Sequence, residues 1–287
     1  MTKNKYRTSL DGLVIENPVE SFFNYCIERE NIRIKRESGE VFPWSEDKIF
    51  QKGRFLNVFR EDDRVSKSII NFAKPLTDDL PLLIQALFVS RWCNRQETID
   101  KLNHEDLLDA DKLKDKLNQL EQWENFNAYP VQDVMWNEKT YSRIDTATTL
   151  FYEIKDDLTE IVLDSNLDVI QATNNINKLF RMENDFPIFM ALIDIAWFRE
   201  DVIPITSQVP TGIGAQPYLD RLQKYLDLES HQAVATEMIS LQKKYWPEAK
   251  RPFYPIDIEY QSCECRKYFS YINGTKKFEG KNRLIVN

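Results

Sequence analysis

The segment from Arg54 to Val65 holds residue types that suit phosphate chemistry. Arg60 and Arg64 stand in it beside an asparagine, several carboxylates and aromatic residues. Two arginines four residues apart lie on one face if the segment is helical, and paired guanidinium groups suit a phosphate or a carboxylate. The same charges also fit a solvated, salt-bridged start of a helix. The segment alone leaves both interpretations open.

A second such segment lies near the other end of the chain, from Asp257 to Tyr268. It mixes acids, bases, two cysteines and two tyrosines in one helical register. Ordinary i,i+4 pairing on a helix surface, as between Glu264 and Tyr268, could explain part of the pattern. One stripe of such a helix would carry an acid, a thiol and a base: Glu259, Cys263 and Lys267. A thiol so placed could act as a nucleophile, although nothing else in the sequence supports that role.

The composition predicts an all-α protein. Only seven of the 287 residues are glycine, and long segments mix Leu, Ile, Lys and Glu, which is typical of helices. The length suits one large domain with ample buried core, and no linker rich in Ser, Gly or Pro divides it. We therefore expect a single helical domain over residues 1–287, with two lobes as an option, and a short strand or arm over residues 276–287.

Helix signals divide the chain into a series of segments. A first helix should start near Pro18 and end before Gly39, and a short acidic helix should follow with Ser45 as its N-cap. Further helices are expected over residues 62–72, 79–93, 105–123, 145–163, 166–180, 185–198, 214–226, 230–245 and 255–272. No sustained alternation indicates a strand elsewhere.

Membrane and metal sites are not expected. No apolar run approaches the roughly 18 residues that span a bilayer, and the richest stretch, Phe186–Phe198, is interrupted by Asp194. The N-terminus shows no signal-peptide pattern, so we expect an intracellular, cytoplasmic protein without a membrane partner. Four cysteines and two histidines form no zinc-ligand set. Reduced thiols, no metal, no disulfide and no cofactor are predicted.

The charge distribution is uneven. The net charge is −8, yet residues 97–168 hold 18 acidic and 7 basic residues while residues 243–283 hold 10 basic and 5 acidic ones. A second basic cluster consists of Arg29, Arg33, Lys35 and Arg36. Basic faces on an acidic protein suit weak, sequence-independent contact with DNA phosphates. The alternative is that the basic C-terminal region only solubilises the chain.

Four stretches together resemble a known family. They are Glu28–Arg36 with Pro43–Asp47, then Asn57–Val65, then Arg91–Arg95 with Asn127–Tyr129, and finally Asp257–Tyr268 with its acid-x-acid, Cys-Glu and Lys-Tyr pattern. Their order resembles that of the alpha-glutamyl/putrescinyl thymine pyrophosphorylases, the amino-acid:DNA transferases of bacteriophage DNA hypermodification. Related helical domains have been associated with 5-hydroxymethyluracil DNA kinases.

The resemblance implies an all-helical, two-lobed body descended from the helix-hairpin-helix DNA glycosylases. The hairpin could lie at Val209–Gly214, where Gly212 and Gly214 could offer backbone N–H groups to a DNA phosphate. An ordinary tight turn is as good an interpretation. Residues 179–191 are a second option, without a glycine in the turn.

The reaction that the resemblance implies is substitution on 5-hydroxymethyluracil in DNA. The base is first phosphorylated or pyrophosphorylated, and an amino acid or a polyamine then displaces the phosphate from the exocyclic carbon. The enzyme must hold a flipped base, stabilise a departing polyanion and deprotonate an ammonium group. The partners implied are DNA with modified thymine and a small amine.

Candidate residues follow for each of these tasks. The arginines that suit the leaving phosphate are Arg60, Arg64 and Arg91. The groups that could bind or deprotonate the amine are Asp257, Glu259 and Glu264, with Lys267 adding positive charge. Hydrogen bonds to the base could come from Asn57, Asn94 and Tyr129, and stacking from Trp44 or Tyr268. These two aromatic residues would also fit ordinary core or rim positions.

Two other functions compete with the transferase. Base excision is the ancestral chemistry by resemblance and could use Asp194, although a buried Asp194 that caps a helix or pairs with an arginine is equally compatible with the sequence. A non-catalytic DNA-binding or kinase-accessory module is the other alternative. The sequence contains no P-loop, since its only Gly-Lys, Gly280-Lys281, is followed by Asn282. The enzyme interpretation expects the clustered arginines and acids to line one pocket: Arg60, Arg64, Asp257 and Glu264.

Overall fold

The structure, a computed structural model, describes residues 6–126, 131–166 and 168–278. It is mostly α-helical, which confirms the predicted fold class. Contacts divide the chain into two compact units, Met1–Asp62 with Thr211–Asn287 and Asp63–Pro210. We call them the first and the second unit and describe each by itself. No described helix is long and apolar enough to cross a membrane.

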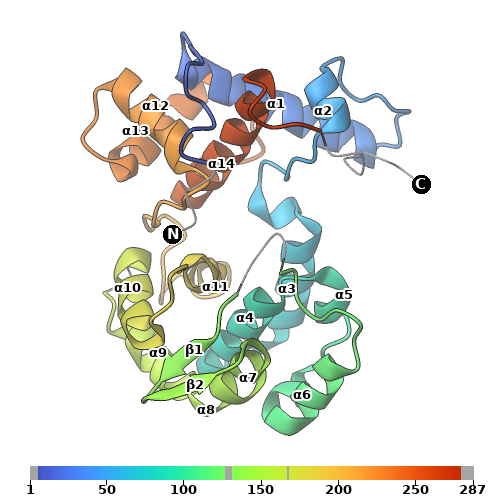
Figure 1. The fold of residues 1–287 in the computed structure, drawn as a ribbon, viewed down its shortest axis with the longest axis vertical. Helices are drawn as coiled ribbons and strands as arrows, with labels where there is room; N and C mark the ends of the chain where they lie inside the picture. Colours follow the sequence, from blue (N-terminus) through green and yellow to red (C-terminus); the bar gives the residue numbers. More distant parts are fainter. Residues whose placement is uncertain (1–5, 127–130, 167, 279–287) are drawn as a thin grey trace. The chain divides into compact units, whose positions relative to one another are not determined.

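The first unit is built around its last helix. Its elements are α1 (Pro18–Glu37), α2 (Lys48–Lys52), the short 3-10 helix η1 (Arg60–Asp62), α12 (Gln216–Leu226), α13 (His231–Tyr245) and α14 (Pro255–Ile272) (Figure 1). Helix α14 packs against α1, α12 and α13. Aromatic rings fill the core between them, with Phe22 edge-on to Phe253 at 6.2 Å and Tyr218 stacked on Phe269 at 5.7 Å.

Local signals at both ends explain where α14 lies. Pro255 occupies its first turn, where a missing N–H costs nothing. Asp257 accepts the backbone N–H of Tyr254 at 2.8 Å and so caps the helix start. Gly274 follows the last turn with φ 69°, a conformation that glycine adopts without strain. Helix α14 therefore begins and ends where the sequence predicts.

The second unit surrounds the apolar helix α4. Its elements are α3 (Arg64–Ala73), η2 (Lys74–Leu76), α4 (Leu80–Cys93), α5 (Gln96–Ile99), η3 (His104–Leu108), α6 (Ala110–Asn118), β1 (Val134–Trp136), β2 (Lys139–Tyr141), α7 (Arg143–Asp145), the π-helical η4 (Thr146–Leu150), α8 (Phe151–Glu153), α9 (Lys155–Leu163), α10 (Val169–Phe180) and α11 (Phe186–Ala196). Helix α4 packs against α11, α9 and α3, and is buried from Leu83 to Cys93. Its start is capped by Asp79, which accepts from the Leu82 N–H at 3.1 Å.

Several sequence predictions about local structure are corrected. Ser45 does not cap α2, because Asp47 does so by accepting the Ile49 N–H at 2.7 Å. The helix expected over residues 105–123 is split into η3 and α6, since Asp109 caps a new start there. The helix expected over residues 145–163 is interrupted at Ile154.

A small antiparallel hairpin was not predicted. Strands β1 and β2 pair Val134 with Tyr141, and Asn137 and Glu138 turn the chain with positive φ angles. Three residues per strand are too few for an alternation pattern to stand out. Of the strand or arm expected over residues 276–287, only 276–278 are described, and they form no strand.

Candidate functional site

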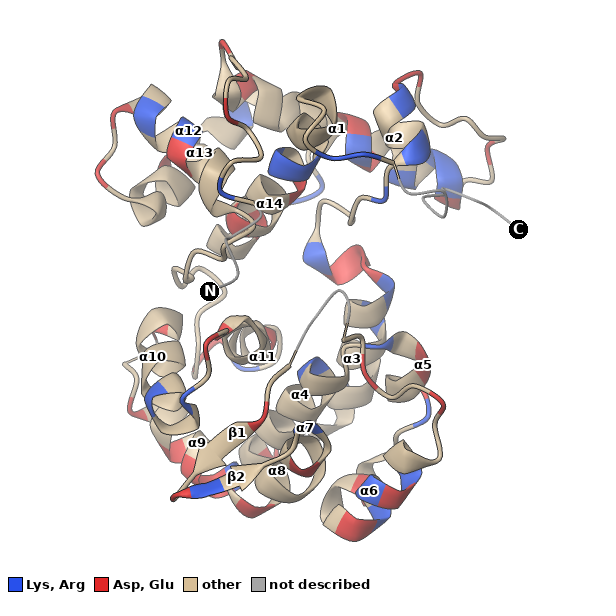
Figure 2. Ribbon diagram, viewed as in Figure 1, with Lys and Arg blue, Asp and Glu red and all other residues tan. Residues whose placement is uncertain are grey.

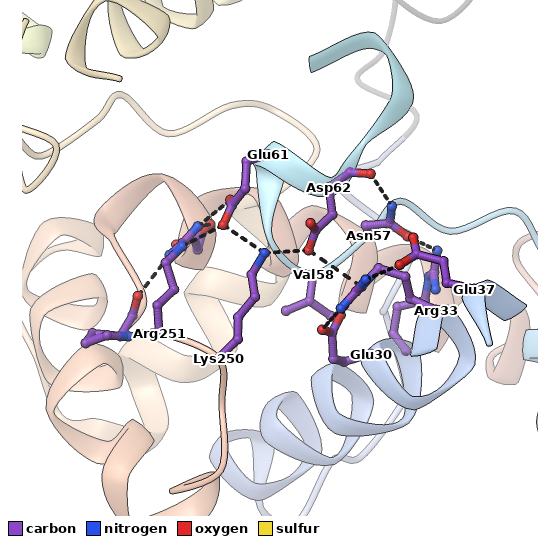
Figure 3. Close-up of polar contacts among 12 residues, drawn as sticks. Glu30, Arg33, Glu37, Asn57, Val58, Glu61, Asp62, Lys250 and Arg251 are labelled. Atoms are coloured by element: carbon purple, nitrogen blue, oxygen red, sulfur yellow. Dashed lines mark hydrogen bonds and ion pairs between the residues drawn. The ribbon is translucent and has the colours of Figure 1, made fainter. Parts of the chain in front are cut away.

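Ion pairs with two other parts of the first unit, α1 and the loop at Lys250 and Arg251, hold the end of the segment from Arg54 to Val65 (Figure 3). Glu61 pairs with Lys250 at 2.9 Å and with Arg251 at 2.7 Å. Asp62 pairs with Lys250 at 2.6 Å and lies 3.5 Å from Arg33 of α1. Burial alone would raise the pKa of Glu61, but hydrogen bonds from Arg251 and Lys250 lower that pKa to about 2. These carboxylates therefore stay charged and anchor the loop.

Asp257 belongs to this ion-pair network. Its side chain is fully buried and accepts hydrogen bonds from Arg251 at 2.6 and 3.2 Å. Burial raises the pKa of Asp257, against the lowering effect of Arg251. Because the same carboxylate caps α14, its observed contacts are structural.

Glu264 is engaged in a separate set of contacts. It accepts the backbone N–H of Leu56 at 3.0 Å and pairs with Lys267 at 2.7 Å. Lys267 also lies 5.2 Å from the ring of Phe55. Asp257 and Glu264 thus have different partners, and Arg64, exposed at the start of α3, belongs to the second unit. Within the first unit, the described contacts of Asp257 and Glu264 therefore form separate sets.

Asn57 and Arg29 hold the middle of the same loop. Arg29 donates to the Asn57 side chain at 2.5 Å and to the Phe55 carbonyl at 3.3 Å. The amide of Asn57 donates to the Asp62 carbonyl at 2.8 Å. Gln261 of α14 donates to the backbone carbonyls of Asn57 and Val58 at 3.0 and 3.1 Å. Arg29 and Asn57 are both buried, so their observed role is to fix the loop on α14.

Glu259 differs from the other acids of α14. Its carboxylate accepts the backbone N–H of Gly212 at 3.0 Å and is 6% exposed. Burial raises the pKa of Glu259 to about 7, although Gly212 and the charge of Arg60 act in the opposite direction. Arg60 is itself buried, at 2% exposure, in η1. A carboxyl group with a pKa near neutral is suited to take up and release a proton.

The glycine loop before α12 packs directly on α14. Arg266 donates to the Gly214 carbonyl at 3.0 Å and lies 3.6 Å from the sulfur of Cys263. A Cβ atom on Gly214 would lie 2.6 Å from that sulfur, so only glycine fits here without a shift. Burial raises the pKa of the Cys263 thiol, which disfavours a thiolate nucleophile. The Gly212 N–H, considered for a phosphate, is donated to Glu259.

This packing leads to a prediction about Gly214. We expect Gly214→Ala to lower the free energy of unfolding by about 1–3 kcal/mol, because the added methyl group overlaps the Cys263 sulfur. Gly214→Ala combined with Cys263→Ala should recover most of the loss. Urea denaturation of the two variants and of Cys263→Ala alone measures the coupling. Equal losses of unfolding free energy in Gly214→Ala and in the double variant would show that the Cys263 sulfur does not cause the destabilisation.

The two predicted stacking residues lie among other aromatic side chains. The indole N–H of Trp44 donates to the Glu40 carbonyl at 2.7 Å, and the side chain is 4% exposed. Tyr268 donates to Asp47 at 2.5 Å and packs against Tyr25 and Phe50 at 5.6 and 5.0 Å. Trp44 therefore has a core position, and Tyr268 is half-buried.

The basic cluster on α1 is largely neutralised inside the unit. Arg33 pairs with Glu30 and Glu37 at 2.5 Å each. Lys35 donates to the Trp44 carbonyl at 3.2 Å. Arg36 is exposed and lies 4.0 Å from Glu37. Of the four residues of this cluster, Arg36 is the one with an exposed side chain.

The remaining candidates belong to the second unit. Arg91 forms a two-point pair with Asp194, at 2.5 and 2.9 Å, and both side chains are buried. Asn94 ends α4 with φ 39° and accepts from Arg91 at 3.1 Å. The arginine-paired alternative for Asp194 is the arrangement observed. Tyr129 lies outside the described residues.

Comparison with known proteins identifies the family. Residues 16–277 match the family described as "5-hmdU DNA kinase, helical domain". The chain belongs to this family. No curated protein matches the chain, and no solved structure does. This family is related to the pyrophosphorylases that the sequence resembles. The match itself does not extend to the pyrophosphorylase family.

Within this helical domain, the sequence pattern missed the basic partners of the loop. Lys250 and Arg251 hold Glu61 and Asp62, yet they lie about 190 positions away in the chain. No local spacing could have indicated them. The described part of the chain contains no group of three or more His, Cys, Asp or Glu side chains that could hold a metal ion. All four cysteines are free.

Proposed function

We propose that this helical domain acts in the modification of 5-hydroxymethyluracil in DNA, and that it transfers an amine to the phosphorylated base. The family description names a kinase that works on this base in DNA, which supports the substrate class. The observation that carries the chemistry is Glu259, a buried carboxyl group with a pKa of about 7 beside Arg60. Such a group can accept a proton from an ammonium ion near neutral pH.

The proposed step transfers one proton and exchanges one bond. Glu259 takes a proton from the ammonium group, and the amine lone pair then forms a C–N bond to the exocyclic methylene of the base. The C–O bond to the phosphate or pyrophosphate breaks, and this group leaves with the electron pair. Arg60, permanently charged, would stabilise the negative charge of the leaving group. The secondary ammonium product then loses its extra proton.

The product itself tests this proposal. The protein is incubated with DNA that carries phosphorylated 5-hydroxymethyluracil and with a panel of amino acids and polyamines. Nucleosides are then released and measured by mass spectrometry. A new aminomethyl nucleoside that requires both the protein and one amine is the expected result. Phosphorylated base that persists with every amine contradicts the transferase, and release of free base indicates a glycosylase instead.

A non-catalytic module of a DNA kinase is the second candidate. One observation favours it: the acids and arginines expected to form a pocket have internal partners, as in the pairs Asp257–Arg251 and Glu264–Lys267. In that case the protein should bind 5-hydroxymethyluracil DNA and raise the rate of a separately supplied DNA kinase. It should yield no aminated nucleoside with any amine.

Both candidates predict DNA binding that depends on salt. We expect the affinity for duplex DNA to fall at least tenfold between 50 and 200 mM salt, because phosphate contacts release counterions. Lys243 and Lys244 are exposed on α13, and reversing both to Glu should weaken binding at low salt. Lys101→Glu combined with Lys139→Glu, at two exposed positions of the second unit, is the control. Fluorescence anisotropy at several salt concentrations measures the slope, and a flat salt dependence contradicts the prediction.

A further inference from the structure

A strip of aromatic rings lies beside α2 and the C-terminal end of α14. It consists of Phe55, Tyr271 and Phe278, which we call the aromatic strip. The rings of Phe55 and Tyr271 are 6.2 Å apart, and Tyr271 and Phe278 are stacked at 4.4 Å with an interplanar angle of 10°. Phe278 is 41% exposed. The strip therefore offers ring surface to solvent.

Lysine side chains border the strip along its length. Each of three lysine ammonium groups lies over a different ring: Lys52 is 6.0 Å from the centroid of Phe278, Lys267 is 5.2 Å from that of Phe55, and Lys276 is 5.6 Å from that of Tyr271. Arg54 and Lys277 are exposed on the same segments. Figure 2 shows the segment after α14 in blue next to α2, whose lysines are also blue. Lys267 is paired with buried Glu264, so most of the positive charge comes from the other cations.

The combination of exposed rings and lysines indicates one kind of partner. A protein partner for exposed apolar rings would be disfavoured by so many lysines around them, whereas a phosphate backbone is attracted by them. Bases have flat π-faces that stack on aromatic side chains irrespective of sequence. These faces are covered by neighbouring base pairs inside a duplex. A stacking platform bordered by cations thus fits unpaired nucleotides.

We propose that the aromatic strip binds single-stranded or locally unpaired DNA, with bases stacked on Phe278 and phosphates held by Lys52 and Lys276. The proposal rests on the proposed function, in which the enzyme holds a base that is flipped out of the duplex. The strip would hold the strand next to that base.

The test uses an unmodified thymine oligonucleotide of about twelve nucleotides, which cannot react. Fluorescence anisotropy is measured for the wild-type chain and for Phe278→Leu, which keeps an apolar side chain but removes the ring. The matched control is Phe126→Leu, because Phe126 is 47% exposed and lies 4.5 Å from the Arg143 guanidinium in the second unit. We expect Phe278→Leu to weaken binding about tenfold and Phe126→Leu to leave it unchanged.

Charge is tested separately, in case the aromatic change disturbs folding. Lys52→Gln combined with Lys276→Gln should lower the slope of log affinity against log salt by about 0.7 for each lysine that contacts a phosphate. Lys139→Gln is the control, since Lys139 also lies over a ring, 4.3 Å from Tyr141. Thermal melting of each variant confirms that it is folded.

Three results would overturn the proposal. The first is that Phe278→Leu and Phe126→Leu change the affinity for the oligonucleotide equally. The second is an unchanged salt slope in the Lys52→Gln/Lys276→Gln variant. The third is that Phe278→Leu weakens the binding of duplex DNA as much as that of the oligonucleotide. Tighter binding of an RNA of the same sequence would assign the strip to RNA instead. Absence of an aminated nucleoside would refute the proposed reaction and leave the result with the unmodified oligonucleotide standing.

Discussion

If Glu259 is the general base of the proposed amine transfer, Glu259→Gln is expected to lower the rate of that reaction by about a hundredfold or more. The amide keeps the size of the side chain and can still accept the Gly212 N–H, but it cannot take a proton from the amine. General-base groups typically contribute about 10²–10⁴-fold to a rate. Product formation is measured by mass spectrometry under single-turnover conditions. Glu229→Gln, at an exposed position between α12 and α13, is the matched control and should be fully active.

The pH dependence gives an independent check on Glu259. Its pKa is about 7, so the rate should rise with pH up to about 7 and level off above it.

The free energy of unfolding should change with pH in the opposite direction. The folded protein holds this proton more tightly than the unfolded chain, whose pKa is near the ordinary 4.5. The stabilising effect is therefore complete below about pH 4.5 and is lost as the pH rises through 7.

The size of this stability change can be estimated from the pKa difference. It corresponds to about 3 kcal/mol of unfolding free energy between pH 4.5 and values above 7. Glu259→Gln should remove this part of the pH dependence, so the variant should gain stability relative to the wild type at pH 8. Urea denaturation at pH 5, 6.5 and 8 measures the effect. Parallel curves for the two proteins would contradict the raised pKa.

Arg91→Met should destabilise the second unit by about 3–5 kcal/mol. The change leaves the Asp194 carboxylate buried without the guanidinium that accounts for its two-point pair. Replacing both residues, as Arg91→Met with Asp194→Leu, should recover most of the stability, because apolar side chains can replace a buried pair at little cost. Urea denaturation provides the free energies.

An exposed pair in the same unit provides the control. Arg199 and Asp201 make a similar two-point contact at 2.7 and 2.8 Å, but the Asp201 side chain is 66% exposed. Arg199→Met should cost less than about 1 kcal/mol, since surface pairs contribute little. Equal costs at the two sites would contradict the explanation from burial. Normal product formation by the folded Arg91→Met/Asp194→Leu variant would remove both residues from the reaction.

Local signals explain which parts of the fold were predictable. Helix α14 lies over residues 255–272 as expected, since Pro255 and Gly274 mark its limits. Helix α4 begins at Leu80, one residue after the predicted start, because Asp79 caps it. The helix predicted over residues 105–123 was wrong in its limits, because the short 3-10 helix η3 comes first and α6 starts only after it. Strands of three residues carry too little periodicity to be distinguished from a loop.

The candidate site was less predictable than the fold. The sequence singled out Asp257, Glu264 and the carboxylates of the Arg54–Val65 segment, but it could not reveal which cations neutralise them. Arg251 meets both Glu61 and Asp257, and only the folded chain brings these three together. Glu259 was named among several equivalent acids. Its raised pKa depends on burial against the Gly212 loop, a property of tertiary packing.

The division of the chain has a consequence for the order of folding. The first unit is assembled from residues before 63 and after 210, whereas the second unit is one continuous segment. During synthesis the second unit can fold as soon as it has emerged, but α1 must wait for α14, on which it packs. Until then Phe22 and Phe23, fully buried in the finished protein, remain exposed. We therefore expect a nascent chain that is cut after Pro210 to retain a cooperative second unit and to aggregate through its first 62 residues.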